Sequence, residues 1–141
     1  MQIVRSLRTA AAPERLFVHL DDLVDYPAWM PLVHEVEQLD ESSWLVELRA
    51  QVGPFARSKR LRMERTSMVA NERAVFERRE QDGREHSRWV LRADLAVDDD
   101  GLTELTMTMS YDGSLWAGPI LERVLDDQVR RGSERLLDLV N

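Results

Sequence analysis

Residues 103–140 combine two patterns that restrict the fold more than any other part of the chain. Apolar and polar residues alternate from Thr103 to Tyr111, which is typical of a strand with one buried face. From about Pro119 the apolar residues follow helical spacing to Val140, which predicts one long amphipathic helix. Because this helix must bury its apolar stripe, we expect it to pack on the apolar face of a sheet. A sheet that curves around a helix can leave a cavity between the two.

Composition narrows the range of functions. The 141 residues fit one domain, and we expect residues 1–141 to form a single domain because no linker or repeat divides them. A net charge of -7 argues against nucleic acid as a partner. The absence of cysteine excludes disulfides and thiolate metal sites.

The start of the chain does not resemble a signal peptide, and no apolar run reaches the roughly 18 residues of a membrane span. We therefore expect a cytoplasmic protein without stable membrane insertion, either a monomer or a weak homodimer.

The first third of the chain predicts one strand and two short helices. Alternation over residues 2–9 indicates a strand, and Pro13 followed by Glu14 is a favourable first helical turn. Pro27 and Pro31 interrupt the next segment, so residues 25–32 are expected to form a short irregular helix and a loop. From residue 34 onward, the pattern indicates one strand after another.

Two of the later hairpins can be given a register from their turns. Asp82-Gly83 favours a two-residue turn, which would place Phe76 opposite Trp89. The next hairpin buries its apolar residues only if its loop has three residues, with Gly101 in the left-handed conformation. That loop places Trp89 opposite Tyr111, and the hydrophobic pattern thereby selects the register.

The hairpin around Gly53-Pro54 directs charge toward the apolar face. A two-residue turn pairs Leu48 with Lys59 and places Arg57 on the same face, and Arg78 shares a face with Phe76 on a later strand. A buried cation needs a partner, which would be a carboxylate, water or an anionic ligand group. Under this interpretation the three cations hold the acidic or polyphenolic head of an amphipathic ligand. The alternative is that their heads reach solvent while their stems cover apolar surface.

The order of these features covers the whole chain and resembles a known superfamily. A strand, a helix from Pro13, Tyr26-Pro27 and Trp29 ahead of Pro31, a run of antiparallel strands and one terminal helix resemble the START-like, or polyketide cyclase and dehydrase, superfamily. The short string Val52-Gly53-Pro54-Phe55 is similar to the G-type proteins associated with carbon monoxide dehydrogenase.

The resemblance implies an α+β helix-grip fold. Seven antiparallel strands would wrap around the long C-terminal helix, with two short helices after the first strand and an internal pocket for lipids, polyketides or similar molecules. Members include aromatases or cyclases, lipid carriers and accessory factors, so the fold alone does not select a function.

Aromatic and methionine side chains form the main set of candidate ligand contacts. Such side chains are bulky and adaptable, which suits a hydrophobic ligand, although ordinary core packing would explain any single member equally well. The hydroxyl of Tyr111 could orient a carbonyl or carboxylate of the ligand. Besides Arg57, Lys59 and Arg78, the predicted ligand-binding residues are Trp29, Met30, Phe55, Met63, Phe76, Trp89, Met107, Met109, Tyr111 and Trp116.

The sequence predicts no catalytic residue, metal site or cofactor. The three histidines, His19, His34 and His86, are not grouped by any metal-ligand spacing. Paired carboxylates fall in turns or on solvated faces, and no serine stands in a nucleophile elbow. The leading hypothesis is therefore non-covalent binding or transport of a hydrophobic or amphipathic small molecule. A polyketide aromatase or cyclase is the first alternative, and an accessory protein of an oxidoreductase complex is the second.

Overall fold

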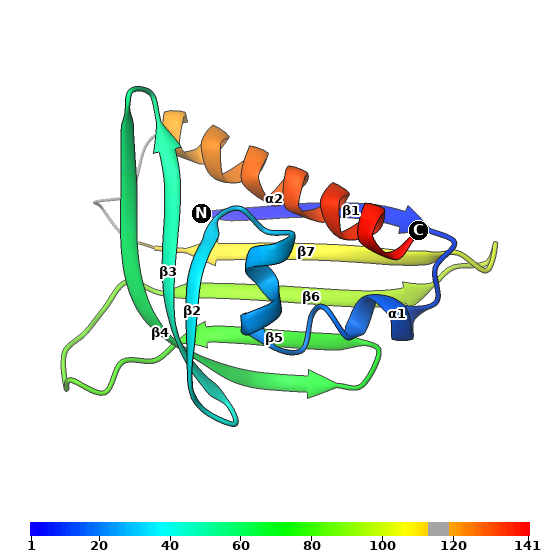
Figure 1. The fold of residues 1–141 in the computed structure, drawn as a ribbon, viewed down its shortest axis with the longest axis horizontal. Helices are drawn as coiled ribbons and strands as arrows, with labels where there is room; N and C mark the ends of the chain where they lie inside the picture. The colour runs from blue at the N-terminus through cyan, green and yellow to red at the C-terminus, as the bar shows by residue number, and fades with distance from the viewer. Residues whose placement is uncertain (113–118) are drawn as a thin grey trace.

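The fold predicted from the sequence is confirmed by a computed structural model, which describes residues 1–112 and 119–141 (Figure 1). The predicted site residue Trp116 lies outside the described residues. The elements, in chain order, are β1 (Gln2–Thr9), α1 (Pro13–Phe17), η1 (Leu23–Ala28), β2 (Val33–Asp40), β3 (Ser43–Val52), β4 (Phe55–Val69), β5 (Arg73–Arg78), β6 (Trp89–Val97), β7 (Thr103–Tyr111) and α2 (Pro119–Val140).

The seven strands form one antiparallel sheet in the order β1-β7-β6-β5-β4-β3-β2. The first strand, β1, therefore pairs with the last strand, β7, and forms one edge of the sheet, while β2 forms the other edge. β4 has 15 residues and changes register between Arg65 and Ser67, as a β-bulge does where a strand bends. Figure 1 shows β4 curving there, so that β3 and the first part of β4 stand across one end of α2.

Two of the predicted hairpin registers are confirmed. In the β3–β4 hairpin Leu48 lies opposite Lys59, and in the β6–β7 hairpin Trp89 lies opposite Tyr111. Gly101 has a φ of +77°, and its N–H donates to the Asp98 carbonyl at 3.0 Å. The left-handed glycine and the three-residue loop are therefore present as the hydrophobic pattern required.

The predicted register between β5 and β6 is wrong by two residues. Phe76 lies opposite Leu91 rather than Trp89, because β5 ends at Arg78 and β6 begins only at Trp89. Asp82 does form a local turn, in which its Oδ1 accepts from the Arg84 N–H at 3.0 Å, but this turn does not continue the ladder. A shift of two residues leaves every side chain on its original face, so alternation alone cannot detect it.

The long helix α2 buries one face against the sheet. Its buried residues are Leu121, Leu125, Val129, Gly132, Ser133, Leu136, Leu137 and Val140. Ile120, which continues the helical stripe in the sequence, is instead 70% exposed in the first turn of the helix. No helix within the described ranges has the length and the apolar character needed to cross a membrane.

Candidate functional site

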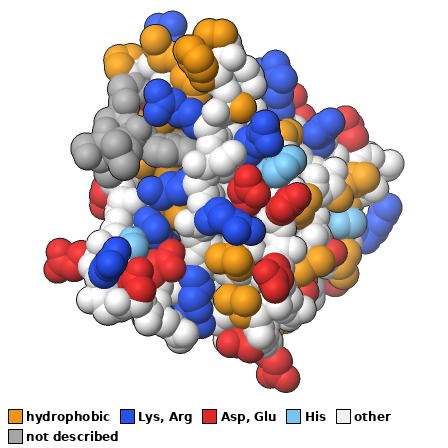
Figure 2. All heavy atoms as spheres, turned by 60° about the vertical axis from the view of Figure 1, so that its left-hand side comes forward, with side chains coloured by type: hydrophobic (Ala, Val, Ile, Leu, Met, Phe, Trp, Pro, Cys, Tyr) orange, Lys and Arg blue, Asp and Glu red, His pale blue; other side chains and the backbone are white. Residues whose placement is uncertain are grey.

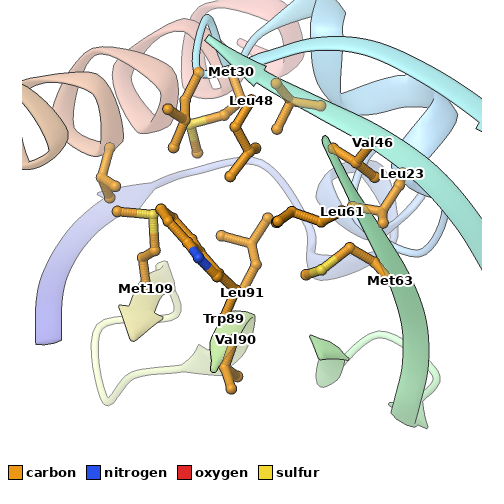
Figure 3. A pocket seen from close by; sticks show the side chains of 13 residues that line it. Leu23, Met30, Val46, Leu48, Leu61, Met63, Trp89, Val90, Leu91 and Met109 are labelled. Carbon is orange, nitrogen blue, oxygen red and sulfur yellow. The ribbon is translucent and has the colours of Figure 1, made fainter. Parts of the chain in front are cut away.

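An apolar pocket lies between the concave face of the sheet and α2 (Figure 3). Its lining consists of hydrocarbon and thioether side chains together with the indole of Trp89. In chain order the lining residues are Leu23, Met30, Leu32, Val33, Val46, Leu48, Leu61, Met63, Trp89, Val90, Leu91, Met109 and Val129. These residues come from the η1–β2 segment, four strands of the sheet and the middle of α2, so the pocket exists only in the folded chain.

The pocket is almost filled by the protein's own side chains. The centre of a water molecule can reach about 20 Å³ inside it, which corresponds to roughly one water position. A lipid or a polyketide is far larger than this space. Any such ligand would therefore have to displace lining side chains or move α2 away from the sheet.

Strand pairing brings much of the lining together. Val46 lies opposite Leu61 in the β3–β4 hairpin, and Leu91 lies opposite Met109 in the β6–β7 hairpin. In each pair both side chains point to the concave face, because alternate residues of a strand share a face. In Figure 3 these strands approach from different sides, with their labelled side chains directed toward the same space.

Met30 reaches the pocket because a glycine in α2 leaves room for it. A Cβ atom on Gly132 would lie 2.7 Å from the Met30 Sδ and 3.3 Å from its Cα. Glycine inside a helix is less favourable than alanine by about 1 kcal/mol, so this residue weakens α2 locally. In return the η1–β2 segment packs directly on the helix, and Met30 is completely buried there.

A double-mutant cycle tests this contact. We expect Gly132→Ala to lower the free energy of unfolding by about 1–3 kcal/mol in the wild type, as overpacking does. In a Met30→Ala background the thioether is gone and only the 3.3 Å contact with the Cα of residue 30 remains, so the same substitution should destabilise the protein clearly less, with the gain in helix propensity offsetting part of the cost. Urea denaturation of the four proteins measures the coupling. The same effect of Gly132→Ala in both backgrounds would contradict the assignment.

The structure separates the predicted aromatic and methionine residues into groups. Met30, Met63, Trp89 and Met109 line the pocket. Phe55 does not, and it is 70% exposed. The other described members are buried in the core outside the lining: Trp29, Phe76, Met107 and Tyr111.

Hydrogen bonds explain why two of these aromatic residues are held away from the pocket. The Trp29 indole N–H donates to the His19 carbonyl at 3.2 Å. Tyr111 stacks on Trp89 with ring centroids 4.8 Å apart, while its hydroxyl donates to the Met1 Sδ at 3.6 Å. Burial raises the pKa of the Tyr111 hydroxyl, with Glu122 adding to the effect. The hydroxyl proposed to orient a ligand thus points to the N-terminus of the chain.

The three predicted cations have different environments. Arg57 is exposed and Lys59 is half-buried. The Arg78 side chain is 8% exposed, and its Nε donates to the Glu80 carboxylate at 3.0 Å. Its Nη1 also donates to the Ser87 hydroxyl at 3.1 Å. Arg78 therefore has a carboxylate of its own chain as partner, and it anchors both ends of the segment between β5 and β6.

Lys59 lies beside the pocket and, like Arg57, forms no ion pair with another described residue. It lies opposite the pocket residue Leu48. Burial lowers the pKa of the Lys59 amine, the nearby Arg78 lowers it further, and Glu80 opposes the shift. An anion bound here would favour the charged amine.

Sequence reasoning missed nine of the lining residues, all of them aliphatic. The predicted registers already placed Val46, Leu61 and Leu91 on the inner face, so this signal was available for the strands. Nothing distinguished Leu23, Leu32 or Val129 from ordinary core residues, because aliphatic side chains carry no special chemistry. The remaining missed residues are Val33, Leu48 and Val90.

The described residues contain no group of three or more His, Asp or Glu side chains that could hold a metal ion. His86 instead contacts the Asp82 carboxylate at 2.8 Å.

Comparison with known proteins identifies a family with this architecture. Residues 1–140 match the model of a family described as polyketide cyclase / dehydrase and lipid transport. A comparison with curated protein sequences found no significant match. The similarity of Val52–Phe55 to the G-type proteins associated with carbon monoxide dehydrogenase stays a prediction.

Solved structures with low sequence identity share the fold. A conserved protein from Geobacillus kaustophilus is similar with a TM-score of 0.78 at 15% identity, covering 99% of this chain and 95% of that one. A START superfamily protein from Mycobacterium smegmatis has a TM-score of 0.75 at 14% identity, with 99% and 96% covered. The Zhui aromatase/cyclase from a Streptomyces species has a TM-score of 0.61 at 16% identity, with 99% and 90% covered.

Proposed function

Because the chain belongs to the polyketide cyclase / dehydrase and lipid transport family, we propose that it binds a hydrophobic or amphipathic small molecule non-covalently between the sheet and α2. The observation that carries this proposal is the apolar pocket, whose described lining offers no charged side chain. A lining of this kind favours binding of the apolar part of a ligand, because binding buries nonpolar surface of both the ligand and the pocket.

Binding requires the pocket to expand, and the lining is suited to this. Met30, Met63 and Met109 line it, and methionine has three rotatable bonds and a polarizable thioether. The thioethers can rotate away from an entering ligand and then pack against it. Gly132 has no side chain beside Met30, so rotation of the Met30 thioether is not blocked by a side chain at this position of α2.

The head of an amphipathic ligand would lie toward Lys59. Lys59 lies opposite the lining residue Leu48 across the hairpin, and burial together with the nearby Arg78 lowers the pKa of its amine, while Glu80 opposes this shift. Arg57 lies farther along the same strand face, toward the turn. A carboxylate or phosphate head would therefore pair with the Lys59 amine, whereas Arg78 already has the Glu80 carboxylate as its partner.

The aromatase or cyclase alternative needs a group that moves a proton at the reacting carbon. The described lining supplies hydrocarbon, thioether and indole groups, and none of these is an acid or base near neutral pH. The pocket therefore supports ligand binding better than it supports this chemistry. The role as an accessory protein of an oxidoreductase complex stays a prediction.

Native mass spectrometry of the purified protein tests the proposal directly. We expect a co-purified small molecule, or a rise in Tm with members of a panel of fatty acids and aromatic acids. Val129→Phe places a larger side chain into the nearly filled pocket, and we expect it to reduce binding at least tenfold. Val18→Phe is the matched control, because Val18 is 61% exposed. A ligand-free protein without any thermal shift, or equal binding by both variants, would contradict the proposal.

A further inference from the structure

The tip of the β3–β4 hairpin is unusual for this acidic protein. Residues 49–60 contain Arg49, Arg57, Lys59 and Arg60 but no aspartate or glutamate, although the chain as a whole has a net charge of -7. Arg60 lies opposite Glu47, so its charge is partly balanced. Within the described part of the chain, neither Arg57 nor Lys59 forms an ion pair. The tip is therefore a local positive region.

The same tip exposes apolar surface. Phe55 is 70% exposed at the start of β4, and Ile120 is 70% exposed at the start of α2. The two elements are adjacent at this end of the molecule, where β3 contacts α2. Figure 2 shows hydrophobic side chains gathered at the top, the height at which Figure 1 places the hairpin turn, with lysine or arginine side chains beside them.

We propose that this tip docks reversibly on an anionic lipid bilayer. An exposed aromatic side chain next to unpaired cations fits a membrane interface, where the ring enters the headgroup region and the cations meet lipid phosphates. The acidic remainder of the protein would be repelled by the same surface, so the charge asymmetry also orients the molecule. The inference goes beyond the proposed function, because docking does not require a ligand in the pocket.

Docking in this orientation would bring the pocket close to the bilayer. Phe55, Arg57 and Lys59 alternate along one face of β4, and the next residues on that face are the pocket residues Leu61 and Met63. The docking surface and the pocket thus form one continuous strip. A ligand leaving the bilayer would meet the cations first and the apolar lining next.

Vesicle co-sedimentation tests the docking. The wild type should sediment with equimolar phosphatidylcholine and phosphatidylglycerol vesicles at low salt, and much less with phosphatidylcholine alone. Binding should weaken with added NaCl. The double variant Arg57→Gln/Lys59→Gln should lose about fivefold in affinity for each cation removed. Phe55→Ser should lose at least about fivefold, and an unchanged Tm should show that it is folded.

Matched controls distinguish the tip from general charge and hydrophobicity. Arg15→Gln/Arg135→Gln removes the same charge from two exposed positions on α1 and the C-terminal half of α2, and Val97→Ser removes an apolar side chain that is 59% exposed. Neither control should change the affinity by more than about twofold. Absence of wild-type binding to the anionic vesicles, unchanged binding of either tip variant, or equal loss in the controls would overturn the proposal.

A fluorescent label gives an independent measurement. The chain has no cysteine, so Ala56→Cys provides a single labelling site next to Phe55, which is retained. An environment-sensitive dye at this position should shift its emission to the blue on addition of the anionic vesicles. The same dye on Val97→Cys should not shift. Equal shifts at the two positions, or none at residue 56, would overturn the proposed orientation.

Discussion

Replacing Trp44 with alanine should lower the free energy of unfolding by about 3–5 kcal/mol. Trp44 is completely buried and forms a T-shaped pair with Phe76, with ring centroids 5.3 Å apart. Its indole N–H donates to Asp22 Oδ1 at 3.0 Å, and the Arg65 guanidinium lies 5.6 Å from its centroid. The indole therefore joins the sheet to the start of η1, and its loss removes contacts on both sides.

Equilibrium unfolding in urea measures this effect. Because a small domain is stable by about 5–15 kcal/mol in total, the variant should lose a large part of its stability. Trp44→Phe is the matched control, since it keeps an aromatic ring in the core and removes the indole N–H; we expect it to lose about 1–3 kcal/mol. A loss below about 1 kcal/mol for Trp44→Ala would contradict the central position of this side chain.

Trp89→Ala should lose about 3–5 kcal/mol as well, but here an added ligand should restore part of the stability. Trp89 is 3% exposed and lines the pocket, so its removal joins the vacated space to an apolar cavity. Such cavities bind small aromatic molecules. Indole at ten times its Kd should recover about 1.4 kcal/mol.

The two tryptophan variants control for each other. The space left by Trp44→Ala borders the Asp22 carboxylate and the Arg65 guanidinium, so water can solvate it and indole should restore little. Urea unfolding with and without indole gives both differences. If indole restored the free energy of unfolding equally in both variants, or not at all in Trp89→Ala, the pocket would not bind an apolar ligand as proposed.

The sequence predicted the strand faces because one physical rule controls them. Hydrophobic side chains on alternate residues must share a face, and this placed Leu91 opposite Met109 and Val46 opposite Leu61, as the structure confirms. The rule fails for shifts of two residues, which preserve the faces. The β5–β6 register was wrong for that reason, since Arg78 binds Ser87 and holds a long connection where a tight turn was expected.

The candidate site was predictable only in part. Met63 and Met109 could be placed on the inner face from alternation, but the same argument included Met107, which is buried outside the pocket. Alternation specifies a face and does not specify which part of that face α2 covers. The ion pair that buries Arg78 could not be predicted from strand alternation either, because its partner Glu80 belongs to the irregular segment after β5.

Short-range periodicity and composition were enough to predict the α+β class, the strand faces, the terminal helix and the acidic charge balance. Three features became visible only in the folded molecule: how little space remains under α2, how Gly132 accommodates Met30, and the exposure of Phe55 at a cationic tip. Each of these depends on contacts, or their absence, between segments far apart in the chain. Such contacts are set by the packing of the whole domain, and no local pattern records them.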